Sequence, residues 1–174
     1  MSRVFIGIGS NQGDRLERIS SAVRRLSEIP GVTLRQMASI CETHPVGGPP
    51  QPDFLNTVLE LDTTLAPEEL LGWLKGIESA LGRQPSAQRW GPRAIDLDVL
   101  MYDDRVVAGP QLTIPHAQMH QRRFVLEPFA QLAPDLVHPV LRKTIAELLI
   151  NLVDRPSVTR PVASVGDVVR DVTE

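Results

Sequence analysis

Two aspartates stand one residue apart inside a short apolar run: Asp96 and Asp98 lie in the segment RWGPRAIDLDVL, residues 89–100. Aspartate is uncommon in strands because its side chain competes for local backbone hydrogen bonds. Successive side chains of a strand point to opposite faces, so these carboxylates would share a face roughly 6.5–7 Å apart, twice the rise per residue. Unpaired, their charges repel each other and destabilise the fold. Divalent cations would relieve that repulsion.

The same alternation gives the segment a second face, which is apolar. Its members, which we expect in the core, are Ile95, Leu97, Val99 and Met101. Taken alone, a pair of aspartates with this spacing is as typical of a solvated strand face as of a metal site.

Arginines around the aspartate pair favour the metal site. Mg²⁺ takes one or two carboxylates and shares its remaining positions with water and phosphate oxygens. Guanidinium groups bind further phosphate oxygens in bidentate fashion. The pattern therefore indicates a polyphosphate site, and the arginines available to it are Arg83, Arg89, Arg93, Arg122 and Arg123.

The composition is that of a globular domain without a general affinity for nucleic acid or membranes. The chain has 174 residues and a formal net charge of −3, with a pI of about 5.8, so it should not attract nucleic acid or anionic lipid broadly. No signal-peptide pattern or membrane-spanning apolar run is visible. The lone Cys41 excludes an intramolecular disulfide and fits a reducing compartment. We therefore expect a cytoplasmic protein.

Other common nucleotide and metal motifs are missing from the sequence. It has no G-x-x-x-x-G-K-[ST] motif and no G-x-G-x-x-G motif after a strand. The glycine-containing stretch GIGSNQGD, residues 7–14, lacks the lysine and is more typical of a tight strand-to-helix turn. The four histidines lack zinc-site spacing, but His116 precedes Arg122 closely enough to be a candidate phosphate contact. No Ser-His-Asp or Cys-His arrangement indicates a covalent intermediate.

Apolar periodicity, caps and turn residues predict alternating strands and helices. The order through residue 101 is βαββαβ, that of a ferredoxin-like fold in the α+β class, with a mainly antiparallel sheet flanked by helices. We expect one domain over residues 1–154 and a loosely attached tail over residues 155–174. The expected elements cover residues 4–8, 15–26, 33–40, 58–61, 67–81, 94–101, 106–107, 123–132 and 144–152.

Four blocks of sequence together resemble one enzyme family. They are GSNQGD (residues 9–14), ETHPVGGPPQPDFLN (42–56), LGRQPSAQRWGPRAIDLDVLMY (81–102) and LTIPHAQMHQRRFVLEPF (112–129). In this order they resemble the 6-hydroxymethyl-7,8-dihydropterin pyrophosphokinases, from about residue 3 to residue 152. The resemblance implies transfer of the terminal pyrophosphate of ATP to the hydroxymethyl group of 6-hydroxymethyl-7,8-dihydropterin in folate biosynthesis. It also implies release of AMP and two Mg²⁺ ions as cofactors.

The resemblance assigns roles to individual positions. Asp96 and Asp98 match the carboxylates that bridge both metal ions, and Arg83 and Arg93 match catalytic arginines. A flat pterin ring suits aromatic faces for stacking and an amide that reads its polar edge. The positions matched to pterin contacts are Thr43, Val46, Phe54, Asn56, Trp90 and Phe124. Those matched to ATP contacts are Lys75, Glu78, Arg83, Arg89, Trp90, Arg93, Thr113, His116 and Arg122.

The chain departs from the family pattern at two positions. Pro85 stands where many relatives carry a second loop arginine, and Ala117 where an aromatic residue often follows the histidine. The implied partners are the two small-molecule substrates, with no nucleic acid and no membrane, and we expect a monomer. Two other classes stay open: an RNA-binding module on a ferredoxin-like sheet, although its aromatic platform and basic face are missing, and a metal-dependent phosphatase or nuclease that uses the same aspartates.

Overall fold

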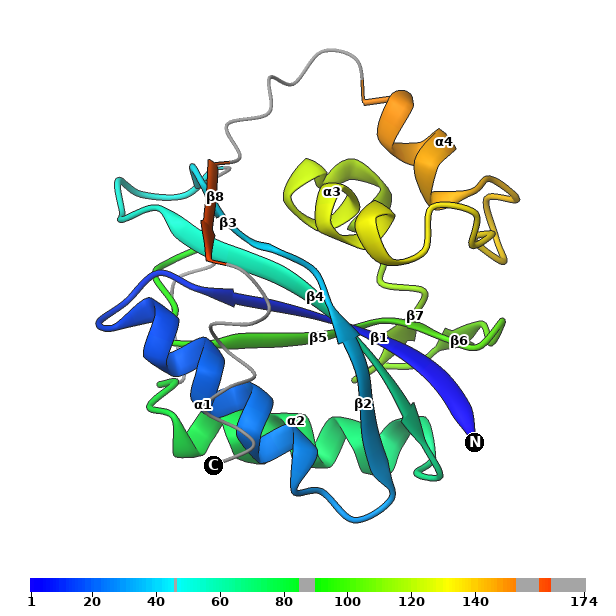
Figure 1. The fold of residues 1–174 in the computed structure, drawn as a ribbon, viewed down its shortest axis with the longest axis horizontal. Helices are drawn as coiled ribbons and strands as arrows, with labels where there is room; N and C mark the ends of the chain where they lie inside the picture. Colours follow the sequence, from blue (N-terminus) through cyan, green and yellow to red (C-terminus); the bar gives the residue numbers. More distant parts are fainter. Residues whose placement is uncertain (46, 85–89, 153–159, 164–174) are drawn as a thin grey trace.

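The structure is a computed structural model that describes residues 1–45, 47–84, 90–152 and 160–163. Its centre is a six-stranded antiparallel sheet with the strand order β5-β1-β4-β3-β8, in which β2 also pairs with β4 (Figure 1). The strands are β1 (Ser2–Ser10), β2 (Val32–Met37), β3 (Ile40–Thr43), β4 (Phe54–Thr63), β5 (Asp96–Tyr102) and β8 (Arg160–Ala163), with a separate pair β6 (Val107–Ala108) and β7 (Thr113–Ile114). The helices are α1 (Arg15–Ser27), α2 (Pro67–Ala80), the 3₁₀ turn η1 (Met119–Gln121), α3 (Arg123–Leu132) and α4 (Ile145–Ile150).

Helix boundaries follow the local sequence. The Asp14 side chain caps α1 by accepting the backbone N–H of Glu17 at 3.1 Å. Pro67 occupies the first turn of α2, where its missing N–H is not needed. Gly82 follows that helix at φ 94°, a conformation that glycine adopts easily. Thr144 starts α4 with a capping box.

The predicted βαββαβ order and the α+β class are confirmed. The second predicted strand, residues 33–40, is wrong in extent because it divides into β2 and β3, which both pair with β4. At the division, Ala38 donates its N–H to Val58 O at 2.9 Å, and its own carbonyl accepts the Thr57 hydroxyl at 2.9 Å. The chain therefore stays against β4 and reaches Thr43 as a strand.

The C-terminal segment contributes one strand that the sequence did not predict. Residues 160–163 form β8, which pairs antiparallel with β3 and covers the outer edge of the sheet. The other residues of the predicted tail, together with 153 and 154, lie outside the described residues.

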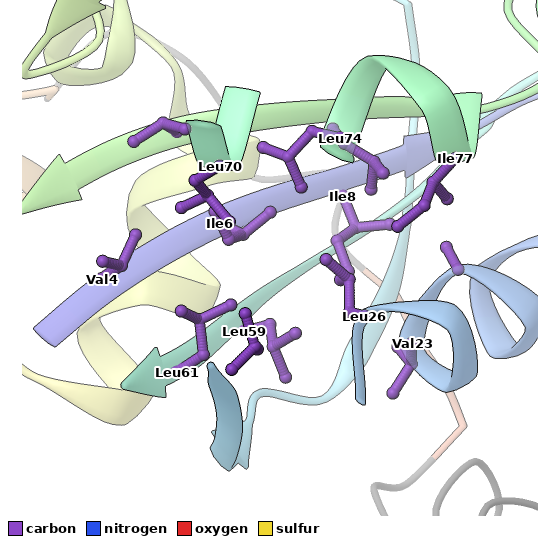
Figure 2. Packing of buried hydrophobic residues seen from close by; sticks show 14 of the residues in the cluster. Val4, Ile6, Ile8, Val23, Leu26, Leu59, Leu61, Leu70, Leu74 and Ile77 are labelled. Carbon is purple, nitrogen blue, oxygen red and sulfur yellow. The ribbon is translucent and has the colours of Figure 1, made fainter. Parts of the chain in front are cut away.

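Two apolar clusters cover the two faces of the sheet. Helices α1 and α2 pack on one face, where Figure 2 shows Ile8 of β1 between Leu26 of α1 and Leu74 of α2. On the opposite face, α3 and α4 pack around Phe129 and other buried side chains. Alternate residues of β1 and β4 serve the two clusters, as the strand period requires.

A bulge in β5 changes the face of its last residues. Ile6 pairs with Val99 but Phe5 pairs with Met101, so Leu100 is an extra residue on β5. Met101 consequently joins the cluster under α3, and the prediction that it shares a face with Val99 is wrong. The carbonyl of Leu100 accepts the His116 N–H at 2.9 Å. This hydrogen bond attaches the segment after β7 to the end of the strand that carries Asp96 and Asp98.

None of the helices in the described part of the chain is long and apolar enough to cross a membrane.

Candidate active site

A pocket of about 550 Å³ opens on the α3 side of the sheet, between β1, β4, β5 and the segment 116–125. The predicted residues that line it are Thr43, Phe54, Asn56, Trp90, Arg93, Asp96, Asp98, His116, Arg122 and Phe124. The fold therefore gathers these predicted pterin and phosphate residues into one cavity, although they come from three separate blocks of sequence.

Four of the predicted site residues lie elsewhere in the structure, and a further two cannot be placed. Lys75, Glu78 and Arg83 lie behind the carboxylates and reach the site through Asp96. Thr113 is exposed on β7. The remaining two, Val46 and Arg89, lie outside the described residues, as does Pro85.

One wall of the pocket presents an amide and a hydroxyl from adjacent strands. Asn56 of β4 donates from Nδ2 to the Thr43 hydroxyl of β3 at 2.6 Å, and both side chains are buried. Gly9 of β1 faces them: a Cβ there would lie 2.8 Å from Asn56 Oδ1, so the absence of a side chain makes room for the amide. Phe54 and Phe124 add partly exposed aromatic faces. This wall can bind a flat ring with polar edges.

The part of the pocket on the other side of Gly9 carries the aspartate pair. Burial raises the pKa of Asp98 to about 7, and the charge of Asp96 adds to the rise, while that of Arg122 opposes it. About a third of the Asp98 side chain (34%) remains accessible, so a ligand in the pocket can reach it. The two carboxylates thus share a face as predicted, and their mutual repulsion is visible in the raised pKa.

His116 is oriented toward this pair by its own turn. Its Nδ1 accepts the backbone N–H of Gln118 at 3.2 Å, so Nε2 carries the hydrogen when the ring is neutral. Nε2 lies 3.9 Å from Asp98 Oδ2. Burial lowers the pKa of His116, and the nearby charge of Arg122 lowers it further. The ring is therefore a neutral donor directed into the pocket.

Arg83 is held between two carboxylates. Its Nη1 donates to Asp96 Oδ1 at 2.8 Å and also binds Glu78. Glu78 is buried and accepts the Leu97 N–H at 3.1 Å, while Lys75 lies 3.1 Å from its other oxygen. The end of α2 is thereby connected to the start of β5 beneath the aspartates.

Two amide side chains, which the sequence did not single out, join the walls of the pocket. Asn11 is 1% exposed; its Nδ2 donates to Gln51 Oε1 at 2.9 Å and to Pro52 O at 3.0 Å, and its Oδ1 accepts the Arg93 N–H at 2.8 Å. Gln51 in turn donates to Trp90 O at 2.8 Å. The motif GSNQGD drew attention to this turn, but only the folded chain shows that its asparagine bridges the segments 51–52 and 90–93.

The carboxylate pair fits a metal ion that arrives with a polyphosphate. In the described residues, no group of three or more His, Cys, Asp and Glu side chains could hold a metal ion. Mg²⁺ needs only one or two protein carboxylates when phosphate oxygens and water complete its octahedron. Asp96 and Asp98 meet that requirement, and their repulsion would fall on binding a cation.

Comparison with known proteins identifies the family. A family model for 7,8-dihydro-6-hydroxymethylpterin-pyrophosphokinase (HPPK) matches residues 5–134. The 2-amino-4-hydroxy-6-hydroxymethyldihydropteridine pyrophosphokinase of Synechocystis sp. is 41% identical over 144 residues, which cover 83% of this chain and 73% of the relative. The protein of the same name from Methylorubrum extorquens is 41% identical over 152 residues, with 87% and 94% covered.

Longer proteins contain a similar unit. The chain is 39% identical over 148 residues to the folic acid synthesis protein fol1 of Schizosaccharomyces pombe, covering 85% of this chain but 20% of that protein. A crystal structure of Plasmodium falciparum HPPK-DHPS has the same fold, with a TM-score of 0.72 at 14% identity, and the match covers 88% of this chain and 44% of that one. The family match and the identities near 40% show that this chain belongs to the 7,8-dihydro-6-hydroxymethylpterin-pyrophosphokinase family.

Proposed function

We propose that this member of the family transfers the terminal pyrophosphate of ATP to the hydroxymethyl group of 6-hydroxymethyl-7,8-dihydropterin in folate biosynthesis. One observation carries the proposal: a ring-binding wall and a carboxylate pair line the same pocket, on either side of Gly9 of β1. Such a pocket can hold a flat heterocycle beside a metal-bound polyphosphate. We further propose a monomeric cytoplasmic enzyme, because residues of one chain build both walls and ATP is a cytoplasmic metabolite.

The pterin would lie between the rings of Phe54 and Phe124. Asn56, already fixed by its hydrogen bond to Thr43, would read the amide-like edge of the ring. Trp90, 40% exposed at the mouth of the pocket, would cover the bound ring. Val46 is included in this proposal because of its position in the matched motif.

The nucleotide would lie along the carboxylate side. Asp96 and Asp98 would hold two Mg²⁺ ions, which when bound neutralise phosphate charge and orient the transferred group. Arg93, Arg122 and His116 also line the pocket and would donate to phosphate oxygens. The other proposed nucleotide contacts are Lys75, Glu78, Arg83, Arg89 and Thr113.

In the reaction, the pterin hydroxyl oxygen attacks the β-phosphorus of ATP in line with the leaving oxygen. A new oxygen–phosphorus bond forms, the bond between the β-phosphorus and the α,β-bridging oxygen breaks, and AMP leaves with that oxygen. The hydroxyl proton is released. The side chains contribute position and charge: two fixed walls bring the reactants together, and arginines stabilise the charge of the moving group.

Pterin-dependent formation of AMP tests the proposal. Purified protein with ATP and Mg²⁺ should form AMP only when 6-hydroxymethyl-7,8-dihydropterin is added, with one pterin diphosphate for each AMP. Release of inorganic phosphate or pyrophosphate without pterin would instead indicate a phosphatase, and cleavage of nucleic acid a nuclease. RNA binding without AMP formation would favour the RNA-binding module.

A further inference from the structure

Two consecutive arginines at the start of α3 are held in different ways. Arg123 donates from Nε to Glu127 at 2.6 Å and from Nη1 to Leu152 O at 3.1 Å, so a carboxylate compensates its charge. Arg122 donates to the side-chain carbonyl oxygen of Gln118, and its guanidinium carbon lies 5.7 Å from the ring centre of Phe124. In the described part of the chain, no carboxylate forms an ion pair with Arg122.

Gln118 contacts two of the basic side chains that line the pocket, His116 and Arg122. Its backbone N–H orients the His116 ring, and its carboxamide oxygen orients the Arg122 guanidinium. Both partners line the pocket, as does Gln118 itself. The short turn between β7 and α3, which contains η1, therefore presents two donors to the carboxylate side in a fixed arrangement.

The chemistry of the acceptor decides what Arg122 can do. A carboxylate at position 118 would hold the guanidinium equally well but would cancel most of its charge before a ligand arrives. A carboxamide oxygen accepts the same hydrogen bond without adding a negative charge, so the guanidinium, whose charge also acts on Asp98, can still attract an anion. Arg83 illustrates the other arrangement, since Glu78 and Asp96 already compensate it.

We propose that Gln118 is a positioning residue for nucleotide binding, which holds Arg122 through a neutral acceptor and so keeps its charge available for the phosphate chain. This inference rests on the proposed function for the identity of its ligand. It distinguishes Gln118 from a residue that only stabilises the turn. For a stabilising role, the presence of an acceptor matters; for this role, the charge of the acceptor matters.

The two roles predict opposite orders of affinity for the ATP analogue in two variants of Gln118. Gln118→Glu keeps an acceptor and adds a negative charge, whereas Gln118→Met removes the acceptor at similar size without adding charge. Binding of Mg²⁺ and a non-hydrolysable ATP analogue is measured by calorimetry, with thermal unfolding as a check of the fold. Asn151→Asp, at the exposed end of α4, adds the same charge at a residue that does not line the pocket, as a control.

We expect Gln118→Glu to weaken binding of the analogue by at least about tenfold, the size of one lost hydrogen bond to a charged group. Gln118→Met should weaken it by less, and Asn151→Asp should leave it unchanged. Equal affinity of Gln118→Glu and the original protein, or a larger loss in Gln118→Met, would overturn the inference. If the original protein binds the analogue but forms no pterin-dependent AMP, only the proposed reaction fails. If it binds no analogue, both proposals fail.

Discussion

Arg83 reaches from the end of α2 to Asp96 and donates from Nη1 to the carboxylate oxygen Oδ1 at 2.8 Å. The same nitrogen contacts Glu78, so the arginine lies between a buried carboxylate and one of the two proposed metal ligands. A cation that binds Asp96 must share this carboxylate with Arg83 or displace it. Metal binding and the position of this arginine are therefore linked.

Removing either aspartate should disable the enzyme. We expect Asp96→Ala and Asp98→Ala each to lower turnover by at least about 10²-fold, the effect of losing one preorganised group that stabilises charge. The measurement is AMP formation across a Mg²⁺ titration, with Asp104→Ala, an exposed aspartate after β5, as the control. Near-normal turnover of either variant at limiting Mg²⁺ would show that the pair does not hold the metal.

The raised pKa of Asp98 predicts how Mg²⁺ binding depends on pH. Burial and then the charge of Asp96 raise it from 3.8 to about 7, so between these values the folded chain keeps a proton that the unfolded chain has lost. The free energy of unfolding of the ligand-free protein should therefore fall as pH rises over this range and level off above it. Mg²⁺ competes with that proton, so it should stabilise the protein more at about pH 8 than at about pH 6.

Thermal unfolding with and without MgCl₂ at the two pH values measures this difference. The Asp98→Asn variant, which has no proton to release at this position, should show a much smaller dependence on pH. An equal Mg²⁺-induced shift in melting temperature at both pH values would contradict the assignment of Asp98 as a metal ligand.

The bridge made by Asn11 predicts a loss of activity without a loss of direct ligand contacts. Asn11→Asp keeps the acceptor for the Arg93 N–H but loses the donors to Gln51 and Pro52 and places a charge against two oxygens. We expect roughly tenfold lower turnover, consistent with leaving buried groups unpaired. Gln51→Ala should have a similar effect, and the double variant should be no worse than the more impaired single variant, since both act through one chain of hydrogen bonds.

Steady-state kinetics of the three variants measures this coupling, with Gln12→Ala, an exposed neighbour of Asn11, as the control. Fully additive losses would mean that the two amides act separately.

The position of strand β8 leads us to predict that part of the C-terminal segment supports the pocket wall formed by Thr43 and Asn56. It pairs with Ile40, Cys41 and Glu42, directly before Thr43. Removing residues 159–174 deletes β8 and leaves the outer edge of β3 unpaired, whereas removing residues 164–174 keeps it. We expect only the longer deletion to raise the KM for the pterin several-fold, with the KM for ATP nearly unchanged. Equal constants for the two deletions would show that β8 has no role at the site.

Much of the architecture was predictable from short-range patterns. Asp14 and Pro67 start helices through contacts within one turn, and alternation along a strand is enough to place Asp96 and Asp98 on one face. The motif blocks also indicated the family and the residues that gather in the pocket. The helix starts and the shared strand face depend on neighbours within a few positions, so the order of residues contains their physical cause.

The tertiary structure decided the features that depend on distant parts of the chain. The bulge at Leu100 is a matter of register between β1 and β5, and an alternating pattern cannot reveal an inserted residue. Asn11 and Gln51 are 40 residues apart, and either amide alone is compatible with any polar turn. Gln118 lies only four residues from Arg122 and contacts it. Its proposed role nevertheless depends on the tertiary structure, because only the fold shows which carboxylates lie within ion-pair distance of that guanidinium. Local chemistry thus determined which groups the chain carries, whereas long-range pairing determined which of them meet, because a hydrogen bond or an ion pair forms only where the folded backbone brings its two ends within reach.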